Sequence, residues 1–179
     1  MRRLRERAVI LAPNHFSAMD HFFCGIYLRR RMRFMAKSQL FDGPLGWILR
    51  HGGAFPVRRG QRDERSMETA LAILAAGGMV VIYPEGGRSR SRDIQTNARP
   101  GVGRLALQSG AAVIPVAIHG SLRARNWRRG EFPKVTIRYG TPVAFSSPEP
   151  DSREHAQLVA DEVLARVREL YGDLSGGGR

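Results

Sequence analysis

The chain has 179 residues and 42% hydrophobic content, which is enough to bury the core of one domain and excludes an intrinsically disordered protein. Its single cysteine, Cys24, excludes an internal disulfide framework and a cysteine-based zinc site, and is consistent with a reducing compartment. The net charge of +13, carried almost entirely by arginine, predicts a surface that attracts polyanions such as nucleic acid, an anionic bilayer or a phosphorylated substrate.

Hydrophobic periodicity and turn residues divide the chain into strands that alternate with helices. In chain order, we expect a strand (Ala8–Ala12), a helix (Asp20–Arg30), a strand (Arg33–Ala36), a short helix (Gly43–Leu49), a strand (Ala54–Val57), a helix (Asp63–Ala76), a strand (Met79–Tyr83), a helix (Pro100–Gly110), a strand (Val113–Ile118), an outer strand (Lys134–Tyr139) and a final helix (about 151–172). This alternation predicts an α/β fold with a largely parallel central sheet flanked by helices. We expect one domain over 1–179, with a core of about 8–145 and a flexible tail at 173–179.

No apolar stretch approaches the roughly 18 residues that a membrane-spanning helix needs, since the longest runs only from Ala111 to Ile118. The basic start, 1–7, resembles the first part of a signal peptide, but the apolar segment after it is too short for the hydrophobic part. We therefore expect a cytoplasmic protein without a cleaved signal, associated peripherally with the inner face of the membrane.

Single residues mark special points in two helices and one strand. Pro100 stands at the first turn of one helix and Gly110 just past its end. Asp151 and Glu154 form a capping-box-like start to the final helix. The expected core face of that helix comprises Val159, Val163, Val167, Leu170 and Tyr171. Pro115 interrupts an apolar strand, which predicts a sheet edge, a bulge or a nearby ligand.

A histidine and an aspartate follow the first predicted strand. His15 stands at the exit of the strand and Asp20 five residues later, at the start of the expected helix. Strand exits of α/β sheets are where side chains converge on ligands, and a histidine with a carboxylate partner can act as a general base. The alternative, in which Asp20 is only a helix N-cap and His15 an ordinary loop residue, stays open on this stretch alone.

Charged side chains also follow two further strands, in the loops 53–60 and 83–89. If the sheet is parallel, the three strand exits lie on one edge. We therefore expect His15, Asp20, Arg58, Glu85 and Arg88 to share one cleft.

Four short blocks stand near the ends of predicted strands: Asn14, His15 and Asp20; Gly53, Phe55 and Arg58 or Arg59; Pro84, Glu85, Gly86, Arg88 and Ser89; and Ile114, Pro115 and Val116. In this order and spacing they resemble the glycerophospholipid acyltransferase family, whose best-known members convert lysophosphatidic acid to phosphatidic acid. The first block matches the HX4D motif of that family. The third departs from it, because Gly87 replaces the usual threonine. The similarity covers most of residues 8–145.

The resemblance implies an acyltransferase-like α/β fold and a reaction in which the acceptor hydroxyl attacks a thioester, so that no protein nucleophile, cofactor or metal is needed. His15 is expected to take the proton from that hydroxyl, an effect typically worth about 10²–10⁴-fold. Asp20 is expected to hold the imidazole in the required tautomer.

The other residues of the blocks are expected to contact the substrates. Arg58, or Arg59 in its place, is expected to pair with the acceptor phosphate, because a guanidinium binds phosphate bidentately. Glu85 is expected to orient an arginine or a glycerol hydroxyl. The resemblance assigns Asn14, Glu85, Gly86 and Arg88 to the acceptor side and Pro115 to the acyl-donor side.

Expected partners are a lysophospholipid acceptor, an acyl-CoA or an acyl carrier protein as donor, and an anionic membrane surface. An acyltransferase acting on another lysophospholipid or a glycolipid is the first alternative.

A hydrolase is disfavoured, because Ser17, although close to His15, lies in no nucleophile elbow. A basic nucleic-acid-binding module is not expected, since the aromatic residues fall mainly in apolar elements. A non-catalytic lipid-binding relative is disfavoured by the presence of both His15 and Asp20. Trp127, in an arginine-rich loop, is either a membrane anchor or part of a mobile loop.

Overall fold

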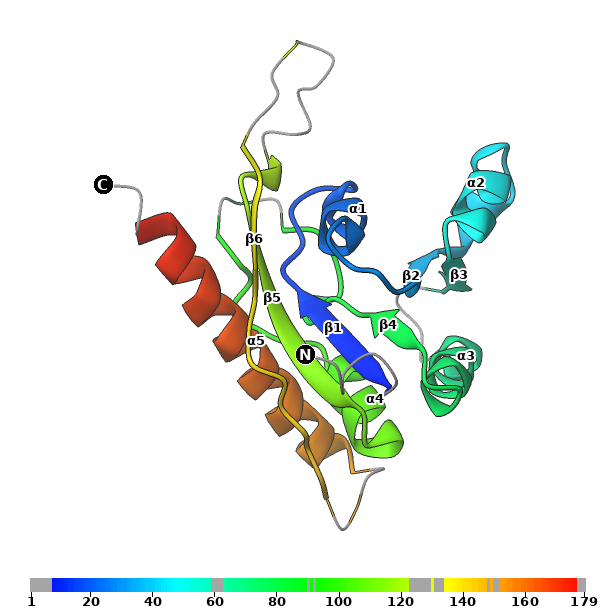
Figure 1. The fold of residues 1–179 in the computed structure, drawn as a ribbon. Coiled ribbons are helices and arrows are strands. Elements are labelled where there is room, and N and C mark those ends of the chain that lie inside the picture. The colour runs from blue at the N-terminus through cyan, green and yellow to red at the C-terminus, as the bar shows by residue number, and fades with distance from the viewer. Residues whose placement is uncertain are drawn as a thin grey trace.

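A computed structural model describes residues 8–58, 63–89, 91, 93–122, 130, 134–147, 149 and 152–176. Its helices and strands are, in chain order, β1 (Val9–Pro13), α1 (Asp20–Gly25), β2 (Met32–Lys37), the 3₁₀ helix η2 (Ser38–Phe41), α2 (Leu45–His51), β3 (Ala54–Val57), α3 (Glu64–Ala75), β4 (Met79–Val81), α4 (Gly101–Ser109), β5 (Ala112–His119), β6 (Thr136–Tyr139) and α5 (Arg153–Gly176) (Figure 1). Arg59, Trp127 and Asp151, all named above, lie outside the described residues.

The strands form one sheet in the order β3-β2-β4-β1-β5-β6. The first five are parallel, and only β6 runs antiparallel, against β5. All five residues of β1 are buried, as its continuous apolar sequence requires of an inner strand of a parallel sheet. The predicted α/β fold with a largely parallel sheet flanked by helices is therefore confirmed, and His15 leaves the sheet from an inner strand.

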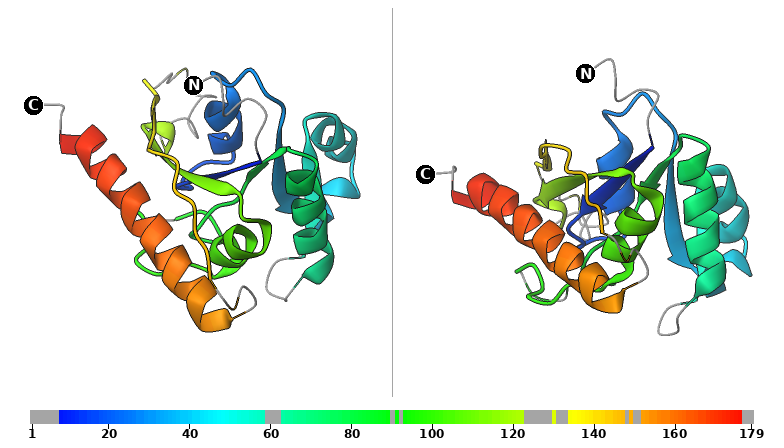
Figure 2. Two further views of the ribbon diagram at one scale, coloured as in Figure 1. Left: turned by 60° about the horizontal axis from the view of Figure 1, so that its bottom comes forward. Right: turned by 90° about the horizontal axis from the view of Figure 1, so that it is seen from below.

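Helices cover the two faces of the sheet unequally. Because successive strand residues point to opposite faces, Ile10 packs in the core with α3, α4 and α5, whereas Leu11 packs in the core with α1 and η2. Figure 1 shows α1 and α2 above the sheet and α3 and α4 below it. Figure 2 shows α5, in orange and red, running alongside α4. One face thus lies under two short helices and the other under three longer ones.

Several elements are shorter than expected, and the structure gives a reason for two of them. The first helix ends at Gly25 rather than at Arg30. A Cβ at Gly25 would stand 2.6 Å from the Cε of Met32, and the guanidinium of Arg30 donates to the carbonyl of Gly77, so tertiary contacts draw the chain out of the helix towards β2. β4 ends before Tyr83, because that residue begins the turn closed by the Gly86 N–H, 3.0 Å from the Tyr83 carbonyl.

The final helix extends further than expected, and its predicted core face is confirmed at Val163 and Val167 only. It continues to Gly176, so residues 173–176, predicted as tail, are helical. Its buried residues are Ala156, Ala160, Val163, Leu164 and Val167. The predicted Val159, Leu170 and Tyr171 are only partly buried. The alanines matter because α5 crosses α4 at Gly103, where a Cβ would collide with the carbonyl of Ala156. Among the described residues, no helix is both long and apolar enough to cross a bilayer.

Pro115 lies beside a bulge, one of the three situations that its position predicted. On one side it is paired in parallel register with Ala12 of β1. On the other side, Val116 pairs with Tyr139 and Val113 with Val143, so three residues (140–142) stand opposite two. The proline, which lacks an N–H, therefore occupies the place where the ladder is already interrupted.

α1 is held on the sheet partly through an aromatic contact of His21. Its ring stacks on Phe34 of β2 with centroids 4.3 Å apart and an interplanar angle of 26°. Burial in this contact, with a further contribution from the neighbouring His15, lowers the pKa of His21 from 6.5 to about 4. The imidazole is therefore neutral in the folded protein over a pH range in which it is protonated in the unfolded chain.

His21→Phe should reduce the loss of stability in acid. Between pH 6.5 and about 4 the unfolded chain binds a proton at His21 that the folded protein does not, so wild-type stability should fall as the pH is lowered. In urea denaturation series over this range, we expect the variant's free energy of unfolding to fall less steeply, by about 1.4 kcal/mol per pH unit. Above about pH 7.5 the two proteins should show parallel dependences. Identical slopes throughout would contradict the burial of a neutral His21.

Candidate active site

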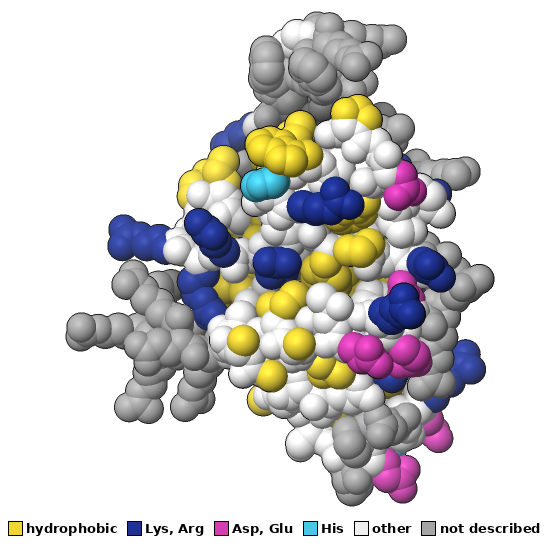
Figure 3. Space-filling model, turned by 90° about the vertical axis from the view of Figure 1, so that its right-hand side faces the viewer, with side chains coloured by type: hydrophobic (Ala, Val, Ile, Leu, Met, Phe, Trp, Pro, Cys, Tyr) yellow, Lys and Arg dark blue, Asp and Glu magenta, His cyan; other side chains and the backbone are white. Residues whose placement is uncertain are grey.

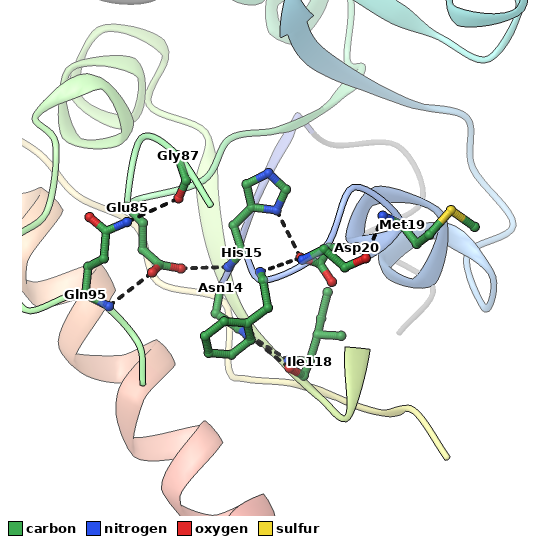
Figure 4. Close-up of polar contacts among 10 residues, drawn as sticks. Asn14, His15, Met19, Asp20, Glu85, Gly87, Gln95 and Ile118 are labelled. Carbon is green, nitrogen blue, oxygen red and sulfur yellow. Dashed lines mark hydrogen bonds and ion pairs between the residues drawn. The ribbon is translucent and has the colours of Figure 1, made fainter. Parts of the chain in front are cut away.

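His15 lies directly beyond β1, is only 6% exposed, and is held by contacts on several sides (Figure 4). Its Nδ1 is 2.9 Å from Oδ2 of Asp20, and its ring stacks on Tyr83 with centroids 3.9 Å apart. Its backbone N–H donates to Oε1 of Glu85 at 2.6 Å, and its carbonyl accepts from the N–H of Ser89 at 2.8 Å. The expected pairing with Asp20 is present, and the ring is fixed from the exit of the neighbouring β4.

Asp20 is fully buried and closes the turn that carries His15. Oδ2 accepts from the backbone N–H groups of Phe16 and Ser17, each at 2.7 Å, in addition to His15. The N-cap of α1 is Met19, without a side-chain cap bond, so the alternative in which Asp20 serves only as an N-cap is wrong. Since a carboxylate only accepts, the Nδ1 atom of His15 carries the proton, and Nε2 has the lone pair. In Figure 4 this second nitrogen points away from Asp20.

Asn14, predicted at the acceptor side, is fully buried and bonded to the backbone of β5. Its Nδ2 donates to the carbonyl of Ile118 at 3.0 Å, and its Oδ1 accepts from the N–H of Ile118 at 2.7 Å. These two bonds continue the pairing of β1 with β5 beyond the end of β1. In this arrangement Asn14 positions His15, and its amide is occupied by the sheet.

Glu85 is likewise buried, and both of its oxygens accept from backbone groups. Oε1 binds the N–H of His15, and Oε2 binds the N–H of Gln95 at 3.1 Å. Burial raises the pKa of Glu85, while the two backbone hydrogen bonds favour its charged form. These two contacts join the loops that carry His15 and Gln95, and a role of Glu85 in orienting an arginine or a substrate hydroxyl stays a prediction.

The loop after Glu85 combines one constrained glycine with one unconstrained glycine. Gly86 has a φ of +69°, and a Cβ there would stand 2.5 Å from the Cγ of Arg99. Gly87 has no atom within 4 Å of its would-be Cβ, so a side chain at this position would start in open space. Arg88 is exposed, and the next residue, Ser89, donates to the carbonyl of His15. The backbone of Arg88 therefore lies next to the His15 turn.

Arg58 lies at the same edge of the sheet but on the outermost parallel strand. β2 and β4 separate its strand, β3, from β1, so the sheet does not place Arg58 directly beside His15. Its backbone N–H donates to Oδ2 of Asp63 at 2.6 Å, and Asp63 also caps α3 by accepting from the N–H of Ser66. These hydrogen bonds, the one from Arg58 above all, lower the pKa of Asp63. The side chain of Arg58 is exposed.

Pro115 is buried within β5, with Ala12 of β1 beside it. It thus belongs to the sheet beneath the strand exits. The structure gathers His15, Asp20 and Glu85 into one hydrogen-bonded group, which Asn14 anchors to β5. It places Arg88 next to this group and Arg58 further along the edge.

The side chains that could act as nucleophiles, Ser17 and Cys24, have structural roles instead. Ser17 Oγ accepts from the Met19 N–H at 3.2 Å, as in a turn. Burial raises the pKa of the Cys24 thiol to about 12, so this thiol is protonated and unsuited to nucleophilic attack. Within the described ranges, no three His, Cys, Asp or Glu side chains are grouped so that they could hold a metal ion.

Sequence reasoning missed Tyr83 and Gln95 as supports of the site. Tyr83 stacks on His15, and the backbone N–H of Gln95 donates the second hydrogen bond to the carboxylate of Glu85. An aromatic residue at the end of an apolar strand, directly before Pro84-Glu85, was the available signal for Tyr83. No comparable signal marks Gln95, whose role depends on the path of a long loop.

Comparison with known proteins identifies the family. The sequence model of the family described as Acyltransferase matches residues 1–119, about two thirds of the chain. The chain belongs to the glycerophospholipid acyltransferase family. It is 26% identical over 173 residues to the 1-acyl-sn-glycerol-3-phosphate acyltransferase of Bacillus subtilis, covering 94% of this chain and 84% of that relative.

Two further relatives of this chain are named after two different acyl acceptors. The human 1-acyl-sn-glycerol-3-phosphate acyltransferase beta is 32% identical over 146 residues, covering 76% of this chain and 50% of the relative. The lyso-ornithine lipid O-acyltransferase of Pseudomonas aeruginosa is 36% identical over 118 residues, covering 63% of this chain and 43% of the relative. The chain thus spans half or less of these two longer proteins.

A solved structure has the same fold. The chain superposes on the 1-acyl-sn-glycerophosphate acyltransferase PlsC of Thermotoga maritima with a TM-score of 0.65 and 23% identity, covering 92% of this chain and 66% of that one. The acyltransferase-like fold expected from the resemblance is therefore confirmed.

Glu85→Gln should impair turnover without unfolding the protein. The amide replaces one acceptor oxygen with an NH₂ group, which would face the N–H of either His15 or Gln95. An unsatisfied buried donor costs about 1–3 kcal/mol, so we expect acyl-transfer kcat to fall about tenfold or more. Steady-state kinetics with unchanged circular dichroism would check this. Glu162→Gln, in an exposed ion pair on α5, is the matched control, and equal kcat in both variants would contradict the positioning role.

Proposed function

We propose that this protein transfers a fatty acyl group from a thioester donor to the hydroxyl of a lysophosphatidic-acid-like acceptor, as in phospholipid biosynthesis. The observation that carries the proposal is the buried hydrogen bond between Nδ1 of His15 and Asp20, which presents Nε2 as a base. The names of the relatives from Bacillus subtilis and human support the choice of acceptor.

The proposed reaction needs only the dyad and the two substrates. Nε2 of His15 takes the proton of the acceptor hydroxyl as its oxygen attacks the thioester carbonyl. The carbon–sulfur bond then breaks, and the imidazolium gives this proton to the leaving thiolate. Asp20 stabilises the imidazolium between the two steps and keeps Nδ1 protonated throughout. The products are the acyl ester and a free thiol.

Arginines at the strand exits suit the acceptor phosphate. The side chains of Arg58 and Arg88 are exposed, and the nearby Glu85 is bound to backbone groups. Guanidinium groups bind phosphate bidentately, and Arg59 is the neighbouring candidate. The thioester donor is an acyl-CoA or an acyl carrier protein. Because the acceptor is a lipid, we place the reaction at the anionic inner face of the membrane, with the protein bound peripherally.

A lyso-ornithine lipid is the second candidate acceptor. The relative of that name has the highest identity of the three named above, 36%. The same dyad would serve, since the acceptor is again a hydroxyl. An ornithine headgroup carries no phosphate, so the two candidates differ in what they require of the arginines.

His15→Ala should abolish transfer while the fold remains. Loss of a general base typically lowers turnover by about 10²–10⁴-fold. The assay uses an acyl-CoA with lysophosphatidic acid and is repeated with an acyl-carrier-protein donor and with a lyso-ornithine lipid. His155→Ala, at a partly buried histidine of α5, controls for the loss of an imidazole. Wild-type turnover by His15→Ala would exclude the proposed mechanism.

Arg58→Ala should weaken use of the phosphorylated acceptor only. A hydrogen bond to a charged group contributes about 1.5–3 kcal/mol, so we expect kcat/KM for lysophosphatidic acid to fall about tenfold or more. The donor KM and the kcat/KM for a lyso-ornithine lipid should stay unchanged. Arg166→Ala on α5 is the control for loss of an exposed arginine. An effect from Arg59→Ala and none from Arg58→Ala would assign the phosphate to the neighbouring residue.

A further inference from the structure

Exposed hydrophobic side chains are concentrated on one layer of the molecule. Among the described residues, six large hydrophobic side chains are more than half exposed. Five belong to the stretch that forms α1, η2 and α2 on one face of the sheet: Phe22, Ile26, Tyr27, Trp47 and Ile48. The sixth, Leu158, lies on α5 on the opposite face.

This concentration follows from the lengths of the helices. α1 has six residues and α2 has seven, so each turns only a narrow side towards the sheet. Within α1, Cys24 is buried, while Phe22 is 53% exposed. The 24-residue α5, by contrast, turns its buried stripe to the core and charged residues outward. Apolar groups gathered on one surface are a mark of an interaction site.

The same stretch is basic. Outside β2, its exposed charged side chains between residues 19 and 51 are Arg29, Arg31 and Arg50, against the single exposed acid Asp42. Arg33 and Lys37 of β2 alternate with Phe34 and Ala36, which pack in the core with α1 and η2, so they belong to the other face of the sheet. Figure 3, which views the side that carries α2 and α3, shows hydrophobic side chains lying among Lys and Arg side chains. Apolar groups interspersed with cations match the interface of an anionic bilayer, where the rings enter the acyl region and guanidinium groups stay at the phosphates.

The surface adjoins the site. α1 begins at Asp20, whose carboxylate holds His15, so the exposed Phe22 lies two residues from the dyad. A second copy of the chain is a poorer occupant of this surface, because it would bring the same cations into contact with one another.

We propose that the layer formed by α1, η2 and α2 is the surface with which this protein docks on an anionic lipid bilayer. The inference rests on the proposed function and deepens it by naming the docking residues. Docking there brings the exit of β1 to the headgroup level, so a lipid acceptor presents its hydroxyl to His15 without leaving the membrane.

The test compares variants that place a negative charge on one or the other face of the sheet. Ile26→Glu and Ile48→Glu change side chains that are 68% and 55% exposed, and Leu158→Glu changes one that is 62% exposed on α5. Binding to vesicles of phosphatidylglycerol and phosphatidylcholine is measured by flotation. We expect at least a tenfold loss of binding for Ile26→Glu and Ile48→Glu, and none for Leu158→Glu. Wild-type binding by the first two, or equal losses in all three, would overturn the proposal.

Fluorescence of Trp47 gives a direct readout. The chain has two tryptophans, so Trp127→Phe leaves Trp47 as the only indole. We expect its emission to shift to the blue with anionic vesicles and to be quenched by lipids brominated in the acyl chain. An unshifted and unquenched Trp47 in vesicle-bound protein would show that docking uses another surface. Sedimentation of wild type and Ile26→Glu tests self-association; a wild-type dimer that the variant loses would assign this layer to a second copy instead.

Activity in solution separates this proposal from the proposed function. With a short-chain, water-soluble lysophosphatidic acid, Ile26→Glu should turn over at the wild-type rate, because the dyad is unchanged. Vesicle binding that depends on Ile26, without acyl transfer by any of the proteins, would refute the function and leave docking standing. Acyl transfer together with unaltered vesicle binding of the variants would refute docking and leave the function standing.

Discussion

One oxygen atom, Oδ2 of Asp20, organises the turn between β1 and α1. The N–H groups of Phe16 and Ser17 and the imidazole of His15 converge on it at 2.7–2.9 Å. A charged oxygen can accept several short hydrogen bonds, whereas a neutral side chain of the same size would leave some of these buried donors unpaired. The atom that closes the turn is therefore also the atom that orients the ring. The same oxygen therefore stabilises the loop and fixes which ring nitrogen of His15 carries the proton.

The order of the strands divides the site into a fixed centre and an exposed periphery. β1 is an inner strand, so its exit is supported from β5 through Asn14 and Ile118, and from the loop after β4 through Glu85. Arg58 follows the edge strand β3 and is anchored only through its backbone. Proton transfer demands a fixed base, while headgroup binding tolerates more freedom. In the proposed reaction, the rigid part of the sheet would carry the first task, and exposed arginines would be available for the second.

The sequence predicted what depends on local patterns. Ala54–Val57 was predicted with its observed ends because Gly53 and the basic residues after Val57 delimit it. The contact of His15 with Asp20 spans five residues and was also predicted. The contacts of Asn14 with Ile118 and of His15 with Glu85 span 104 and 70 residues, so the anchoring roles of Asn14 and Glu85 could not be deduced. The position of Arg58 depends on β2 and β4 lying between β3 and β1, an order that no local pattern encodes.

The polar exit of β1 also decides how the apolar strand is aligned in the sheet. Sliding β1 by two residues would keep each hydrophobic side chain on its own face, so the core alone discriminates weakly against such a slip. The slip would, however, separate Asn14 from Ile118 and His15 from Glu85 at the same time, leaving buried donors and acceptors unpaired. These polar contacts therefore select one alignment from those that the apolar residues tolerate. A chain that has reached the correct alignment has anchored the dyad in the same event, whereas in a misaligned chain the dyad lacks these supports.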